Sequence, residues 1–162
     1  MFYILKFIIL LFLISCSTNE KEIIIANEDD KKIFEKGIKF IEEKKYKESI
    51  DHFIKISDEF PFSKYSGHSQ IYNAYVNFEI NKPEQTILLL NEYISLNPNG
   101  IFTEYAEYLI AMCYYVKVSD PRRDSKFTKI AIEKFNKIIK SRPDTKYAKD
   151  AKFKLEYLKN YL

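Results

Sequence analysis

Cysteine and histidine, the side chains that most often act as nucleophiles, proton carriers and metal ligands, are scarce in this sequence. The chain contains Cys16, Cys113, His52 and His68. Neither histidine has a neighbouring group of Cys, His or paired carboxylates at ligand spacing, so a metal site is not expected. Cys113 lies in the apolar stretch 111–115, which predicts a small buried side chain rather than a reactive thiol.

Sequence motifs for phosphate binding and hydrolysis are also missing. Gly37, Gly67 and Gly100 stand thirty or more residues apart, which is too far for a glycine-rich phosphate loop. Neither G-x-S-x-G nor H-E-x-x-H occurs. We therefore expect no enzyme and no cofactor, apart from a lipid attached covalently to Cys16.

The case for that lipid comes from the residues before Cys16. Lys6 is followed by the apolar run 7–14 and then by Ser15. The run is well short of the ~18 residues that span a bilayer. The pattern resembles a bacterial lipoprotein signal, in which a small residue precedes the cysteine that receives the lipid. This resemblance implies a signal peptide at 1–15 and lipidation of Cys16; the alternative is an ordinary N-terminal membrane anchor.

Ser17 follows the cysteine where an aspartate would retain a lipoprotein of enteric bacteria at the inner membrane. The resemblance therefore implies a protein held by its lipid at the periplasmic face of the outer membrane. Residues 16–29 are mostly polar and are expected to form a lipidated, flexible tether.

The composition favours one helical domain. Three Gly and five Pro in 162 residues are too few for the hairpin turns of an all-β fold. The net charge of +3 is too small to indicate a nucleic-acid partner. The charge is uneven, because residues 17–116 carry −6 and residues 117–162 carry +8.

Three prolines mark an internal repeat. Pro61, Pro98 and Pro143 each follow a helical apolar pattern, and the same residue types recur at fixed distances after each one. Four positions on lies an aromatic residue, eight positions on a small one and ten positions on an apolar one: Tyr65, Phe102, Tyr147; Ser69, Ala106, Ala151; and Ile71, Tyr108, Phe153. This spacing predicts that each proline is followed by a helix with one apolar face.

A partner helix precedes each proline. Twelve positions before them stand the small residues Ser49, Thr86 and Ala131, and eight positions before them stand the large residues Phe53, Leu90 and Phe135. These are second-helix positions of the tetratricopeptide motif, whose first helix carries a small residue followed three later by an aromatic. Gly37 with Phe40 and Ala111 with Tyr114 match that pair, and Ala74 matches its small position only.

The sequence therefore predicts an all-α, tetratricopeptide-type helical-hairpin superhelix of about three and a half repeats over residues 30–162. The expected pairs are 30–44 with 46–58, 66–80 with 83–95, and 103–117 with 126–140, followed by an unpaired helix at 146–161. Because that last helix lacks a partner, we expect Phe153, Leu155 and Leu158 to be uncovered. The alternative is that its lysines make this helix a solvating cap: Lys149, Lys152, Lys154 and Lys159.

The third repeat resembles that of the BamD family of outer-membrane assembly lipoproteins. The resemblance rests on the stretch 104–115, the loop Ser-Asp-Pro-Arg-Arg-Asp at 119–124, and the pattern from Thr128 to Phe135. The segment 143–155 resembles the opening of that family's next repeat, and the loop is the most specific part. The family continues through further helix pairs, so we expect this chain to lack the C-terminal repeats.

Members of that family help the barrel insertase BamA to fold β-barrel proteins into the outer membrane. The resemblance thus implies a lipid-anchored periplasmic scaffold subunit of the assembly machinery, the BAM complex. Its implied partners are BamA, the other assembly subunits, unfolded outer-membrane β-barrel clients and, through the lipid, the membrane. The alternative is a general periplasmic tetratricopeptide lipoprotein for protein interactions in envelope or pilus biogenesis.

Candidate partner-binding residues follow from the repeat. First helices of such arrays line the concave surface, and phenols there keep a polar end for a partner. Tyr75, Tyr105 and Tyr115 are the candidates of this kind, whereas Ile71, Tyr108 and Met112 are expected mainly in the core. Arg122 and Arg123 are candidates for holding an acidic group. The lysines of 126–140 either contact a partner or form a solvated helix face.

Overall fold

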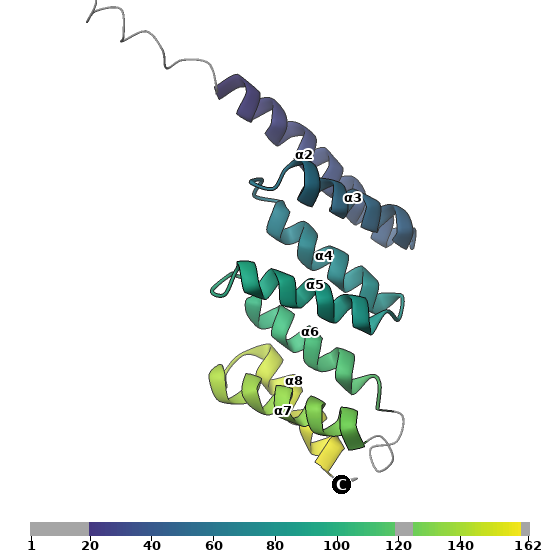
Figure 1. The fold of residues 1–162 in the computed structure, drawn as a ribbon, viewed down its shortest axis with the longest axis vertical. Coiled ribbons are helices and arrows are strands. Elements are labelled where there is room, and N and C mark those ends of the chain that lie inside the picture. The colour runs from purple at the N-terminus through teal and green to yellow at the C-terminus, as the bar shows by residue number, and fades with distance from the viewer. Residues whose placement is uncertain (1–19, 119–124, 160–162) are drawn as a thin grey trace, which may run out of the picture.

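The computed structural model describes residues 20–118 and 125–159 (Figure 1). These residues form helices joined by short turns, and none of them lies in a strand. The helices are α2 (Glu20–Glu42), α3 (Tyr46–Glu59), α4 (Ser66–Glu79), α5 (Pro83–Leu96), α6 (Thr103–Tyr115), α7 (Ser125–Ser141) and α8 (Lys146–Lys159).

Consecutive helices pack against each other, and the stack has two layers. Besides these neighbours, α4 contacts α6 and α6 contacts α8, while Phe34 of α2 stacks on Tyr65 at the start of α4 with ring centroids 4.9 Å apart. Helices α2, α4, α6 and α8 therefore form one layer, here called the inner layer. Helices α3, α5 and α7 form the outer layer, and the chain steps down the stack in hairpins (Figure 1).

Small residues allow the two helices of each hairpin to approach closely. The hydroxyl of Ser49 donates a hydrogen bond to the backbone carbonyl of Gly37 at 3.0 Å. In the next hairpin the hydroxyl of Thr86 donates to the carbonyl of Ala74 at 3.3 Å. Both pairs are twelve residues apart and fully or almost fully buried. A side-chain hydroxyl can bond a helix carbonyl in this way only where the backbones lie close together.

The turns of the first two hairpins share a residue with the same backbone conformation at the same position. Lys44 and Asn81 each stand seven residues after the small residue of their hairpin, and both have φ of 57°. This left-handed conformation is tolerated by Asn and uncommon for Lys. The first two hairpins therefore have equivalent turns although their sequences differ.

Two hydrophobic clusters form the middle and the end of the core. One lies between α4, α5 and α6 around Ile71, Leu90 and Leu109. The other lies between α6, α7 and α8 around Phe135, Ile138 and Leu158. Because α6 contributes to both clusters, it joins the last hairpin to the preceding one.

The sequence located the helices well, with one exception. All helix ends except one agree with the expected bounds to within two residues. The exception is α2, which starts at Glu20 rather than near residue 30, so helix covers most of the segment 16–29 that was expected to be a flexible tether. No glycine or proline occurs before Gly37, and nothing else in this stretch stops a helix.

The expectation that α8 exposes its apolar residues was largely wrong. Leu155 is 8% exposed and Leu158 is fully buried, whereas Phe153 is 73% exposed. Helix α8 packs against α7 and also contacts α6. It is therefore covered by the preceding hairpin and does not need a following helix to bury its leucines.

Replacing Gly37 with Ala should destabilise the protein. An added Cβ would lie 2.8 Å from Cε1 of Phe53, which is fully buried and packed against the rings of Phe34 and Tyr72. Overpacking of this kind costs about 1–3 kcal/mol, more than the ~1 kcal/mol that Ala gains over Gly inside a helix. Urea unfolding followed by circular dichroism measures the difference.

Gly67→Ala is the matched control. An added Cβ there meets only Cε2 of Tyr93, at an ordinary 3.7 Å. This variant should be as stable as the wild type or more stable, by up to about 1 kcal/mol. Equal stabilities for the two variants would show that close approach at Gly37 does not constrain the hairpin.

Candidate functional site

Two of the three predicted tyrosines lie together on the inner layer. Tyr75 comes from α4 and Tyr105 from the first turns of α6, and both are half-buried. Burial raises the pKa of the Tyr105 phenol well above its ordinary value, and the nearby phenols of Tyr75 and Tyr147 add to this effect. The pKa of Tyr75 is also raised, first by burial and then by the carboxylate of Glu79 one turn further on.

Further tyrosines complete this group. The Tyr147 ring of α8 lies 5.7 Å from the ring of Tyr105 and 5.1 Å from that of Tyr108. The hydroxyl of Tyr108 donates a hydrogen bond of 2.5 Å to Asp150 Oδ2. We call the set Tyr72, Tyr75, Tyr105, Tyr108 and Tyr147 the tyrosine cluster; it joins α4, α6 and α8.

Tyr115 lies apart from this cluster, at the other end of α6 from Tyr105. Its ring is 6.0 Å from that of Phe135 and 6.3 Å from that of Tyr157. The ammonium of Lys154 lies over the Tyr115 ring, 5.3 Å from its centroid, and also pairs with Asp150 at 3.3 Å. Tyr115 is therefore linked to the tyrosine cluster indirectly: Lys154 contacts its ring and pairs with Asp150, which accepts the hydrogen bond from Tyr108.

Aromatic side chains continue along the inner layer toward α2. His68 lies between Phe34 and Phe102, with ring centroids 6.0 and 4.7 Å away. Tyr72 of the tyrosine cluster also contacts Phe34, at 5.7 Å. An aromatic surface thus runs along the inner layer, from α2 over α4 and α6 to α8.

Within and beside the tyrosine cluster, the structure adds three residues that the sequence analysis did not select. These are Tyr72, Tyr147 and Asp150. Tyr147 occupies the aromatic position four residues after Pro143, equivalent to Tyr65 and Phe102, and that repeated position was a usable signal. Tyr108, expected mainly in the core, is half-buried and keeps its hydroxyl on Asp150. Ile71 is 5% exposed, as a core residue should be.

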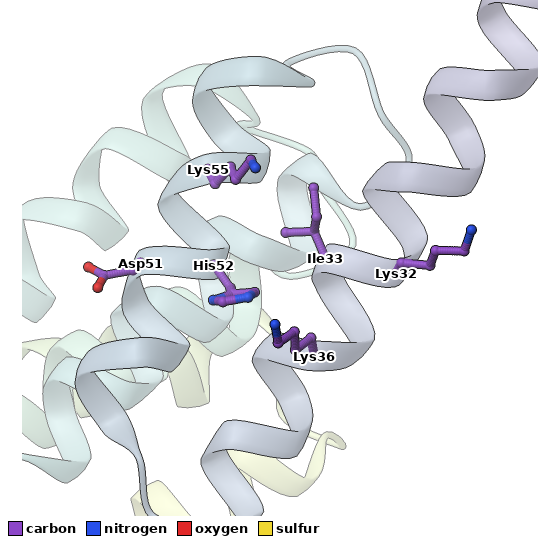
Figure 2. A pocket seen from close by; sticks show the side chains of 6 residues that line it. All are labelled: Lys32, Ile33, Lys36, Asp51, His52 and Lys55. Atoms are coloured by element: carbon purple, nitrogen blue, oxygen red, sulfur yellow. The ribbon is translucent and has the colours of Figure 1, made fainter.

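The cavities among the described residues lie elsewhere. The larger one, about 360 Å³, is an open hollow between α2 and α3 (Figure 2). Ile33 and His52 line it, together with Lys32, Lys36, Asp51 and Lys55. The His52 ring packs edge-on against Phe40 at 5.0 Å and its Nδ1 bonds the Glu48 carbonyl at 2.9 Å, so both histidines serve as packed rings in this structure.

A smaller cavity of about 110 Å³ lies between α5, α6 and α7, beside Lys134 and Lys137. Lys137 forms an ion pair with Glu107 at 2.8 Å. The lysines of α7 thus belong to an outer-layer helix. The charged neighbours of the tyrosine cluster are Glu79, Asp150 and Lys146, whose ammonium lies over the Tyr147 ring at 5.0 Å from its centroid. The cluster therefore has neighbours of both charges.

Several predicted residues fall outside the described part of the chain. Cys16 is one, and Arg122 and Arg123 are the others. The other cysteine, Cys113, is fully buried, and burial raises the pKa of its thiol to about 12. This confirms that Cys113 is a packing residue and not a reactive thiol at neutral pH.

Within residues 20–118 and 125–159, no helix is long and apolar enough to cross a membrane. The same residues contain no group of three or more His, Cys, Asp and Glu side chains placed to hold a metal ion.

Comparison with known proteins identifies the family. A family model described as "YfiO: Outer membrane lipoprotein" matches residues 26–162. The chain belongs to this family. The match covers all the described helices except the first turns of α2. The description of the family agrees with the expected association with the outer membrane.

Relatives of this chain include proteins named "Outer membrane protein assembly factor BamD". That of Rickettsia prowazekii (strain Madrid E) is 32% identical over 130 residues, which cover 80% of this chain and 52% of the relative. That of Caulobacter vibrioides is 27% identical over 130 residues, which cover 80% of this chain and 43% of the relative. The chain thus spans about half the length of the curated relatives it matches.

A solved structure supports the tetratricopeptide fold. The first such domain of Spaghetti (RPAP3), bound to an HSP90 peptide, matches with a TM-score of 0.60 and 19% identity. The match covers 83% of this chain and 93% of that one. The predicted helical-hairpin superhelix is confirmed for this member of the YfiO family.

Tyr105→Phe should reduce the sensitivity of the fold to alkali. The folded state raises the pKa of Tyr105, whereas an unfolded tyrosine ionises near pH ~10. The stability that comes from keeping this phenol neutral is fully present below pH ~10 and is lost as the pH rises further. Urea midpoints measured at about pH 8 and about pH 11 should therefore differ less for Tyr105→Phe than for the wild type.

Tyr157→Phe controls for the removal of a hydroxyl from a more exposed tyrosine on α8. If Tyr105→Phe loses as much stability between the two pH values as the wild type, the phenol of Tyr105 is not held neutral by the fold.

Proposed function

We propose that this protein is a lipid-anchored periplasmic subunit of the machinery that assembles β-barrel proteins into the outer membrane. The observation that carries the proposal is the YfiO family match over residues 26–162, together with relatives named as outer-membrane protein assembly factors. Cys16 is the proposed site of the lipid. The proposed partners are BamA, other subunits of the BAM complex and unfolded barrel clients.

The tyrosine cluster is the proposed contact for clients. Transmembrane β-strands carry outward apolar side chains and girdles of aromatic residues, so an unfolded barrel protein offers rings to any aromatic surface. Tyr75 and Tyr105 present rings that are only half-buried, and their pKa values are raised, so both keep a neutral hydroxyl. Ring stacking together with hydroxyl donors suits an extended segment without demanding one sequence.

The charge near the cluster limits where a client carboxylate can bind. Glu79 and Asp150 neighbour the tyrosines and repel an anion. Of the nearby cations, Lys154 is already paired with Asp150 and Lys146 lies over the Tyr147 ring. Arg122 and Arg123, which follow α6 in the sequence, are the proposed site for that carboxylate. We therefore place the client's rings on Tyr75 and Tyr105, and its acidic end toward Tyr115 and the arginine loop.

Lipidation of Cys16 gives the first test. In cells fed with labelled palmitate, the wild-type chain should incorporate label and sediment with outer membranes, because Ser15 and Cys16 end an apolar signal segment. Cys16→Ala should lose both the label and the sedimentation. Equal incorporation in the two chains would show that Cys16 is not the residue that carries a lipid.

Client binding gives the second test. A fluorescent peptide from the C-terminal strand of an outer-membrane barrel protein, titrated against the protein, should bind with micromolar or weaker affinity. Tyr105→Ala should cost about 1–3 kcal/mol of binding free energy through lost ring contact and hydrogen bonding. Arg122→Ala/Arg123→Ala should cost a similar amount that shrinks as salt rises, because exposed charges are screened beyond ~8 Å at physiological ionic strength.

Leu88→Ala, on an exposed position of outer-layer helix α5, is the control for this titration. If the peptide binds all four proteins alike, the client-binding role of the tyrosine cluster is wrong. Binding to the periplasmic domains of BamA without any binding of the peptide would leave the scaffold role standing alone.

A further inference from the structure

The two most exposed large apolar side chains of the described residues lie on one edge of the helix stack. The Phe62 side chain is fully exposed and that of Ile101 is 82% exposed. Phe62 lies in the turn between α3 and α4, and Ile101 in the turn between α5 and α6. Leu96, the last residue of α5, is 66% exposed beside the second of these turns.

The alternation of the helices places these turns together. The stack has two edges, and the turns that lead from an outer-layer helix to the next inner-layer helix all lie on one of them. Contacts across the repeats support this, since Ser63 donates a hydrogen bond to Asp30 of α2 and Arg142 pairs with Glu104 at 4.0 Å. We call the edge formed by residues 60–65, 97–102 and 142–145 the N-terminal edge.

The start of α2 points to the same edge. Because Ser63 bonds Asp30, the first turn of this edge lies level with residue 30, and α2 continues from there toward Glu20. In Figure 1 the start of α2 and the three turns lie along the left side of the molecule. The chain therefore enters the fold from the side on which Phe62 and Ile101 are exposed.

A lipid on Cys16 would keep this edge near a bilayer. Four residue steps separate Cys16 from Glu20, and they reach at most about 14 Å when fully extended. The ten residues from Glu20 to Asp30 add about 15 Å of helix. The anchor would thus hold the first turn of this edge within about 30 Å of the bilayer surface, and the second turn lies on the same edge.

Charge on the edge neither excludes nor drives such a contact. The three turns that define the edge, residues 60–65, 97–102 and 142–145, carry Lys64 and Arg142 against Asp144. The apolar side chains must therefore supply the attraction, as they do in interfacial membrane segments. Pro61 directly precedes Phe62 and restricts the backbone that holds the ring outward.

We propose that the N-terminal edge docks on the membrane that holds the anchor, with Phe62 and Ile101 inserted into the head-group region of its lipids. This inference rests on the proposed anchor at Cys16. It gives the helix stack a fixed orientation, edge to the bilayer, rather than free rotation about a tether. The opposite edge, with residues 43–45 and 80–82, then faces the periplasm.

The chain contains no tryptophan, so a single introduced one reports its own surroundings. The full chain is produced with its signal, purified from membranes and reconstituted into vesicles of phosphatidylethanolamine and phosphatidylglycerol. Phe62→Trp and Ile101→Trp should each emit at shorter wavelength on vesicles than in detergent-free solution, and lipids brominated on their acyl chains should quench them several-fold more than they quench a Leu88→Trp control. Leu88 is 61% exposed on the middle of α5.

A lipid attached chemically to Cys16 distinguishes a wrong assignment of the anchor from a wrong assignment of the docking edge. For this arm the chain is made without residues 1–15, so that it is not acylated and the Cys16 thiol is free. That thiol is coupled to a maleimide lipid in the vesicles, and Cys113, which is fully buried, stays unreacted. If the tethered Phe62→Trp and Ile101→Trp chains then match Leu88→Trp in emission and quenching, the docking of this edge is wrong, whether or not cells acylate Cys16. A blue shift that needs no vesicles and grows with protein concentration would also overturn it, by assigning the edge to a second copy of the chain.

Discussion

The close approach of two helices within each hairpin is the constraint on which the other features depend. Gly37 faces the fully buried ring of Phe53, and hydroxyls of Ser49 and Thr86 reach the backbone carbonyls of the partner helices. A larger residue at these points would separate the helices and change the angle at which each hairpin meets the next. The stacking of repeats, and hence the alignment of the inner layer, follows from these small contacts.

Alignment of the inner layer is what creates the tyrosine cluster. Its members come from α4, α6 and α8, and each helix supplies only one or two rings. The hydrogen bond from Tyr108 to Asp150 links α6 to α8 at a point where these helices have few other contacts. The cluster is therefore both a surface for a partner and part of what holds the last helix in place, so changes in it are expected to affect stability and binding together.

The sequence predicted the repeat because prolines and small–large pairs recur at fixed distances, and those distances reflect helix packing directly. It placed Tyr75 and Tyr105 on one surface because both fall on first helices of the repeat. Without the angle between hairpins it could not separate Tyr115 from them, and it missed Tyr72 and Asp150 for the same reason. The early start of α2 was missed because residues 16–29 have no long apolar pattern that would indicate a helix, although no glycine or proline there would stop one. Leu155 and Leu158 were misjudged because only hairpin partners were considered, whereas α8 also packs on α6.

Photocrosslinking in living cells tests the central claim, that the tyrosine cluster contacts unfolded barrel proteins, most directly. A photoreactive phenylalanine derivative placed at Tyr105 should crosslink to newly made outer-membrane β-barrel proteins, and the same group at Leu88 on the outer layer should not. The crosslinks at Tyr105 should fade once synthesis of barrel proteins is stopped. Equal crosslinking at both positions, or crosslinks at Tyr105 that contain no barrel protein, would contradict the account.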